Sequence, residues 1–139
     1  MTHCTLPPEG VQRLLAADPA HVYIDVRTVE EFEAGHVPGS YNIPIFSKTP
    51  MGMQPNSEFE ALVQRHFRPT QALVFGCRSG VRSERACELF TALGYGELVN
   101  MSGGFEGSPD QPGWRAAGLA STRTAEPGRS YRELCARGS

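Results

Sequence analysis

One cysteine lies where the sequence predicts a strand to end and a helix to begin. The apolar residues 72–75 predict a short buried strand, which Gly76 ends. A helix is predicted from Val81 until Gly94, and its apolar positions recur at intervals of three and four: Ala86, Leu89, Phe90 and Leu93. Cys77 therefore lies after a strand and before a helix, at the edge where parallel α/β sheets bind ligands.

This position favours a nucleophilic sulfur at Cys77. The N-terminus of a helix presents unpaired backbone N–H groups and a partial positive charge, so it favours a thiolate over a thiol. Gly80 lets the backbone curl so that several N–H groups point inward, and Arg78 and Arg82 add permanent positive charge. Residues 77–82, called the Cys77 loop below, thus predict a small anion-binding bowl that could also hold a persulfide.

The Cys77 loop resembles the active-site loop of the rhodanese family, Cys-x-x-Gly-x-Arg, here Cys77-Arg78-Ser79-Gly80-Val81-Arg82. Other segments resemble the family's two further signatures: residues 22–27, 30–32 and 35–44 on the N-terminal side, and residues 99–105, 114 and 117–119 on the C-terminal side. The resemblance covers roughly residues 5–120. Three matching segments in the right order are far more specific than the loop alone.

The resemblance implies a thiosulfate sulfurtransferase-like enzyme. In this family the loop cysteine takes a sulfane sulfur from thiosulfate or a persulfide, holds it as a persulfide, and passes it to cyanide or a thiol. Cys77 is then the expected catalytic residue, and the expected substrate-binding residues are Arg78, Ser79, Gly80, Val81 and Arg82. No metal or organic cofactor is implied. The expected partners are a small sulfur donor and acceptor, or a protein sulfur donor such as a cysteine desulfurase.

Strands alternate with helices along the chain, which predicts an α/β fold with a parallel sheet covered on both faces. The rhodanese resemblance implies the same fold, with about five short strands. We expect residues 1–120 to form this domain and residues 121–139 to form a C-terminal tail that is mobile or docks on the body.

Asp25 and Arg27 are the expected supporting residues of the site. They end the strand predicted at residues 21–26, at the same sheet edge as Cys77. They could pair with each other or with backbone groups to hold the loop, or Asp25 could accept a proton directly. His36 is expected to be a satisfied turn histidine, and Cys87 a packed structural thiol.

Two other functions compete with sulfur transfer. A phosphatase or arsenate reductase of this kind uses Cys-x5-Arg, whereas only four residues separate Cys77 from Arg82 and residue 83 is Ser. The second is a non-catalytic binding or regulatory module: some domains of the family that this chain resembles lack the cysteine and serve in that way, whereas Cys77 is present here with the full loop. A sulfur carrier that is loaded by a protein partner remains open, because the loop sequence does not distinguish it from an enzyme that uses thiosulfate.

Composition narrows the functional class. The chain has 139 residues and a net charge of −2, so nothing indicates a nucleic-acid or membrane surface. It has neither a signal-peptide pattern at its start nor an apolar run of the ~20 residues that cross a membrane. The four cysteines are widely spaced without a Cys-x-x-Cys pair, which argues against a zinc site and favours a reducing cytoplasm. Cys4 and Cys135 have no expected role.

The other elements predicted in the first half of the chain are a helix within residues 1–20, a capped helix from Thr28 to Gly35, a strand at 41–43 and a loop at 45–55. A second capping box at 57–60 predicts the start of another helix. The second half is predicted to contain a strand at 96–101, an inserted loop at 106–112, a short helix at 114–117 and one helical turn around 131–135. The insertion separates Gly104 from Trp114, and we expect it to lie at the rim of the site.

Overall fold

Short apolar segments form the central sheet of this protein. The computed structural model describes residues 3–137. Its main sheet has the order β1-β7-β6-β2-β3, and every neighbouring pair is parallel. The strands are β1 (Cys4–Leu6), β2 (Val22–Asp25), β3 (Tyr41–Asn42), β6 (Ala72–Gly76) and β7 (Glu97–Met101). The predicted parallel sheet of five short strands is confirmed.

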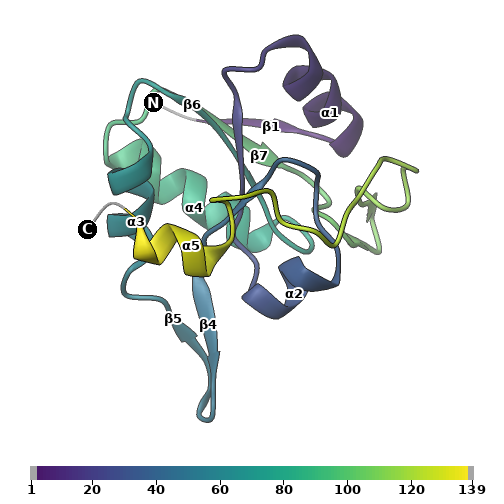
Figure 1. Cartoon of the computed structure of the whole chain (residues 1–139). Coiled ribbons are helices and arrows are strands. Elements are labelled where there is room, and N and C mark those ends of the chain that lie inside the picture. The colour runs from purple at the N-terminus through teal and green to yellow at the C-terminus, as the bar shows by residue number, and fades with distance from the viewer. Residues whose placement is uncertain (1–2, 138–139) are drawn as a thin grey trace.

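Side chains alternate between the two faces of the sheet, and each face is covered. One face packs Ile24, Leu73, Phe75 and Leu98 against α3 (Phe59–His66), α4 (Val81–Ala92) and α5 (Tyr131–Ala136). The other face packs Tyr23, Val74, Val99 and Met101 against α1 (Pro8–Ala17). Figure 1 shows α1 on one side of the strands and α3, α4 and α5 on the other.

The carboxyl ends of the central strands meet at one edge, as expected for the site. Asp25 of β2 lies opposite Gly76 of β6, and Phe75 of β6 lies opposite Asn100 of β7. The Cys77 loop leaves β6 between these neighbours. Residues from three strands are therefore brought to one place.

The first predicted helix is shorter than expected, because β1 precedes it. Three residues, Cys4–Leu6, pair with β7 at the sheet edge, and such a short strand shows no periodicity of its own. The helix itself begins at Pro8, in agreement with the expected proline in its first turn. Residues 1–2 and 138–139, which the sequence assigned to this helix and to the tail, lie outside the described residues.

The prediction of a loop at residues 45–55 is wrong, because this segment forms an antiparallel hairpin. Its strands are β4 (Phe46–Thr49) and β5 (Gly52–Pro55), and Figure 1 shows the hairpin projecting from the body. The turn is fixed locally: the Met51 N–H donates to Thr49 Oγ1 at 3.1 Å, and Gly52 takes a φ of +97°. Since β5 is exposed along its whole length, it lacks the apolar alternation that predicts a strand.

The capping box predicted at Thr28 is confirmed, whereas the prediction of a second capping box at residues 57–60 is wrong. Thr28 and Glu31 cap α2 (Val29–Ala34) reciprocally. At α3 the N-cap is Glu58, which makes no side-chain cap bond. Asn56 supplies the turn instead, because its Oδ1 accepts from the Glu58 N–H and its carbonyl from the Phe59 N–H, both at 3.1 Å.

The C-terminal part of the chain is more ordered than a loose tail. Residues 107–112 form a two-stranded ribbon, β8 (Gly107–Ser108) and β9 (Gln111–Pro112). The prediction of a helix at 114–117 is wrong, because this segment forms only turns. The predicted turn near residue 131 is the helix α5, which docks: Leu134 is 1% exposed and its carbonyl lies 2.9 Å from His66 Nε2. No helix within residues 3–137 has the length and apolarity needed to cross a bilayer.

Candidate active site

Cys77 follows β6 directly and lies buried at the start of α4, with 1% of its surface exposed. The Gly80 N–H donates to its Sγ at 3.0 Å, and Ser83 Oγ lies 3.3 Å from the same sulfur. Gly80 has a φ of +107°, which favours glycine and turns the chain back toward the sulfur. The expected position of a sulfur at a helix N-terminus is therefore confirmed.

A second segment braces the Cys77 loop from outside. The Cys77 carbonyl accepts from the Phe105 N–H at 2.7 Å, and the Arg78 carbonyl accepts from the N–H groups of Glu106 and Gly107 at 2.9 and 3.2 Å. In a trans peptide the next N–H points opposite the carbonyl. These bonds thus turn the N–H groups of Arg78 and Ser79 away from residues 105–107.

The brace depends on Gly104. This residue has a φ of +65°, and a Cβ placed there would lie 2.5 Å from the backbone carbon and oxygen of Arg78. The turn can therefore approach the loop only if residue 104 has no side chain. The expected insertion at 106–112 meets the Cys77 loop through the N–H groups of its first two residues.

Asp25 and Arg27 pair with each other at the sheet edge where β2 ends beside β6, and both are buried. The Arg27 guanidinium donates from Nε and Nη2 to the Asp25 carboxylate, at 2.9 and 2.7 Å, and also to the Gly35 carbonyl at 2.7 Å. Burial opposes the Arg27 charge, but the Asp25 carboxylate outweighs it, so the pKa of Arg27 is raised. The pairing matches a supporting role, and the role itself stays a prediction.

Arg82 is held by Glu31, which the sequence did not single out as a site residue. Its Nη1 and Nη2 donate to the two Glu31 oxygens at 2.8 and 3.0 Å. Burial would raise the pKa of Glu31, but hydrogen bonds from Arg82 and Thr28 lower it to about 2. Only two of the five guanidinium N–H groups are used in this pair, so Arg82 keeps donors for an anion.

The other loop side chains lie at the outer rim. Arg78 is exposed, Val81 is 75% exposed, and Ser79 is half-buried. Two polar residues behind the sulfur, Ser83 and Asn100, are buried and were missed by the sequence interpretation. Their signal was weak: Ser83 directly follows the loop motif, and Asn100 is a polar residue in an otherwise apolar strand.

The other titratable candidates behave as expected. His36 is buried, stacks on Phe32 and has its Nδ1 2.7 Å from the Phe32 carbonyl. Burial raises the pKa of the Cys87 thiol strongly. All four cysteines are free, and Cys4 and Cys135 are exposed. In the described part of the chain, no three His, Cys, Asp or Glu side chains are grouped as a metal site.

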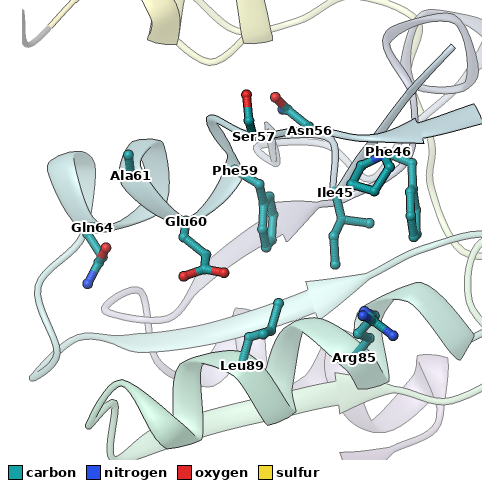
Figure 2. A pocket seen from close by; sticks show the side chains of 11 residues that line it. Ile45, Phe46, Asn56, Ser57, Phe59, Glu60, Ala61, Gln64, Arg85 and Leu89 are labelled. Carbon is teal, nitrogen blue, oxygen red and sulfur yellow. The ribbon is translucent and has the colours of Figure 1, made fainter. Parts of the chain in front are cut away.

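A cavity of about 550 Å³ lies between α3, α4 and the base of the β4–β5 hairpin. Figure 2 shows Arg85 and Leu89 of α4 facing Phe59 and Glu60 of α3 across it. None of its lining residues belongs to the Cys77 loop. It is therefore a separate feature from the cysteine site.

Comparison with known proteins identifies the class. The model of the rhodanese-like domain matches residues 7–108. Rhodanese-like domain-containing protein 17 of Arabidopsis thaliana is 38% identical over 103 residues, which cover 73% of this chain and 65% of that protein. Thiosulfate sulfurtransferase 16, chloroplastic, of the same plant is 35% identical over 101 residues, which cover 70% of this chain and 84% of that protein.

The solved structures agree with this family. The crystal structure of Rv0390 from M. tuberculosis superposes with a TM-score of 0.76 and 26% identity, covering 89% of this chain and 100% of that one. The chain therefore belongs to the rhodanese family, and both the predicted resemblance and the predicted fold are confirmed. It spans slightly less than two thirds of the length of the first plant relative.

Proposed function

We propose that this protein is a sulfurtransferase that carries a sulfane sulfur on Cys77. The observation that carries the proposal is the sulfur at the N-terminus of α4 with the Gly80 N–H directed at it, 3.0 Å away. The family membership and the relative named thiosulfate sulfurtransferase support it. A helix N-terminus of this kind favours an anionic sulfur.

The proposed cycle has two half-reactions. The Cys77 thiolate attacks the outer sulfur of thiosulfate, a new S–S bond forms, and sulfite leaves with the electron pair of the broken bond. A thiolate or cyanide then attacks the terminal sulfur, and Cys77 leaves as a thiolate. The cycle balances without an added metal or organic cofactor and predicts ping-pong kinetics.

The Cys77 loop stabilises the charge in this cycle. Its N–H groups are fixed before the reaction, so they stabilise a developing anion without reorganising. The free N–H groups of Arg82 bind the sulfonate end of the donor as charge-assisted hydrogen bonds. Exposed Arg78 meets the donor at the rim. Asp25 and Arg27 support the loop from below.

The natural partners follow from the same chemistry. A small donor and a small acceptor suit the buried sulfur, and a protein such as a cysteine desulfurase is the alternative donor. We assign no role to nucleic acid or membrane. Because all four cysteines are free thiols, we place the protein in a reducing compartment such as the cytoplasm.

The test is the release of thiocyanate from thiosulfate and cyanide. We expect parallel lines in double-reciprocal plots of the initial rate against the thiosulfate concentration, measured at several cyanide concentrations. Cys77→Ser should lose at least about a thousandfold in rate, because the covalent carrier is gone, whereas Cys135→Ser should keep the rate. Thiocyanate release by Cys77→Ser at the wild-type rate would contradict the proposal.

A wild-type protein that is inactive with thiosulfate would be tested with a cysteine desulfurase and cysteine. Sulfur transfer to Cys77 from that protein would identify the carrier form of the reaction. A protein that takes up sulfur from neither donor would instead be the non-catalytic module.

A further inference from the structure

A line of hydrogen bonds connects Cys77 with the carboxylate of Glu84, which directly follows Ser83 in the first turn of α4. Ser83 Oγ lies 3.3 Å from Cys77 Sγ and 2.5 Å from Asn100 Oδ1. Asn100 Nδ2 donates to Glu84 Oε1 at 3.0 Å, and 41% of the Glu84 side chain is exposed. Ser83 and Asn100 are buried, so each depends on these partners for its hydrogen bonds.

The Glu84 carboxylate fixes the direction of every bond in this line. A carboxylate only accepts, so the Asn100 NH2 group must face Glu84 and its carbonyl must face Ser83. That carbonyl also only accepts, so it takes the single hydrogen of the Ser83 hydroxyl. The other acceptor within reach of this hydroxyl is the Gly80 carbonyl at 3.3 Å. With either acceptor, Ser83 presents a lone pair to the sulfur.

The two charge states of Cys77 fit this arrangement differently. A thiol donates its S–H to Ser83 Oγ, and every group in the line is then satisfied. An anionic Sγ, as in the thiolate, already accepts from the Gly80 N–H and gains a second donor only if the Ser83 hydrogen turns toward it. The buried Asn100 carbonyl then loses its donor, which is unfavourable.

We propose that Glu84, acting through Asn100 and Ser83, restrains negative charge on Cys77 and so sets how readily the sulfur reacts. Glu84 and Asn100 are positioning residues, since neither touches the sulfur. The consequence for sulfur uptake rests on the proposed function. The effect on the reactivity of the Cys77 thiol does not depend on the proposed function, and it can be measured separately.

Other charged groups lie near these residues, and their influence on Cys77 must be distinguished from that of the hydrogen-bond line. His3 Nε2 lies 2.9 Å from the same Glu84 oxygen, and Arg82, two residues before Glu84, is paired with Glu31. The Cys87 thiol lies near both Glu84 and Cys77. The Glu84 charge also acts on the sulfur directly through space, so a single substitution does not distinguish the two routes.

The first measurement is the rate constant for alkylation of Cys77 by iodoacetamide, followed by peptide mass spectrometry over a pH series. Glu84→Gln permits the Asn100 amide to reverse, so that Nδ2 faces Ser83 and the Ser83 hydroxyl donates to sulfur. We expect a rate about tenfold higher at neutral pH, the size of one hydrogen bond. Glu88→Gln removes the same charge from exposed Glu88, which makes no bond to Asn100, and should change the rate less than about twofold.

The decisive comparison repeats Glu84→Gln in a Ser83→Ala background. If the hydrogen-bond line carries the effect, the substitution at Glu84 no longer changes the alkylation rate there. A rate increase that survives Ser83→Ala would overturn the proposal, because it would act through space. Asn100→Leu serves as a second background if Ser83→Ala does not fold, with the same expected and contrary results. A tenfold effect on alkylation in a protein that takes up sulfur from neither thiosulfate nor a cysteine desulfurase would reject the proposed function and keep this inference.

Discussion

Most of the positive side-chain charge around Cys77 is already paired within the protein. Arg27 is bound by Asp25, and Arg82 is bound by Glu31. Exposed Arg78 has no carboxylate partner among residues 3–137. In the proposed cycle, the N–H groups at the start of α4 and the remaining donors of Arg82 would therefore hold the anion.

Arg82→Ala should weaken the use of thiosulfate more than it weakens the fold. It removes a charge-assisted donor to the sulfonate, so we expect kcat/KM for thiosulfate to fall about tenfold or more, mainly through KM. Steady-state kinetics and the free energy of unfolding measured on the same samples separate the two effects.

Arg85→Ala is the matched control for that substitution. Arg85 is exposed on the same helix one turn later, and its removal should leave kcat/KM unchanged. Equal kinetics for Arg82→Ala and wild type would make Arg82 a structural arginine that only ties α4 to α2.

Glu31→Gln should destabilise the fold at neutral pH and not in strong acid. The pKa of Glu31 is about 2 when folded and ordinarily 4.5, so its ionised form is favoured by folding. This contribution is complete above pH 4.5, declines as the pH falls, and is lost near pH 2. Denaturant unfolding of both proteins across this range should show a difference that shrinks toward acid. Glu30→Gln provides the neighbouring control, and a difference independent of pH would rule out the ion pair as its source.

At the scale of elements, the turn after β7 shapes the Cys77 loop. Three N–H groups from residues 105–107 hold the carbonyls of Cys77 and Arg78. Gly104 makes this contact sterically possible. The shape of the Cys77 loop thus depends on residues 105–107, which lie far beyond it in the chain, and not on its own sequence alone.

Gly104→Ala tests this brace. The added Cβ would collide with the Arg78 carbonyl, so the loop must shift and sulfur transfer should fall about a hundredfold. Gly118→Ala is the control, because Gly118 has a similar positive φ of +75° and nothing within 4 Å of an added Cβ. Both variants should lose about 1–2 kcal/mol of stability from backbone strain, and only Gly104→Ala should lose activity. Equal activity of the two variants would show that the loop holds its shape without the brace.

Elements with a strong local signal were predictable from sequence. The buried strand β6, the amphipathic helix α4 and the Thr28 capping box each depend on residues close together in the chain. The β4–β5 hairpin and β1 were not predictable, because an exposed hairpin has no apolar alternation and β1 exists only by pairing with β7.

The same distinction applies to the site. Cys77 and Gly80 belong to one loop, and their contact follows from its local sequence. Glu31 meets Arg82 across 51 residues, and Asn100 meets Ser83 across 17. Contacts of this kind depend on the sheet order, which the sequence alone did not establish.

At the scale of the whole molecule, the C-terminal segment completes the core. Leu134 of α5 is buried in the same apolar cluster as Phe59, Phe75 and Phe90. Tyr131 accepts a hydrogen bond from Asn56 Nδ2 at 3.0 Å. The segment predicted as a tail thus contributes to the stability of the body.

Leu134→Ala should therefore destabilise the protein by about 2–5 kcal/mol, as expected for a buried leucine. Leu93→Ala is the control, because Leu93 is 38% exposed, and it should cost less than about 1 kcal/mol. Denaturant unfolding measures both. Equal and small losses would mean that α5 does not pack on the core in solution.

In the proposed cycle, Cys77 carries a transferable sulfur. The most direct measurement is the intact mass of the protein after brief exposure to thiosulfate and again after cyanide. We predict a gain of one sulfur atom, located on Cys77 by peptide mapping, absent in Cys77→Ser, and lost on cyanide treatment with release of thiocyanate. Sulfur gained on another cysteine, or no gain with thiosulfate, a small persulfide or a cysteine desulfurase as donor, would show that Cys77 is not the sulfur carrier.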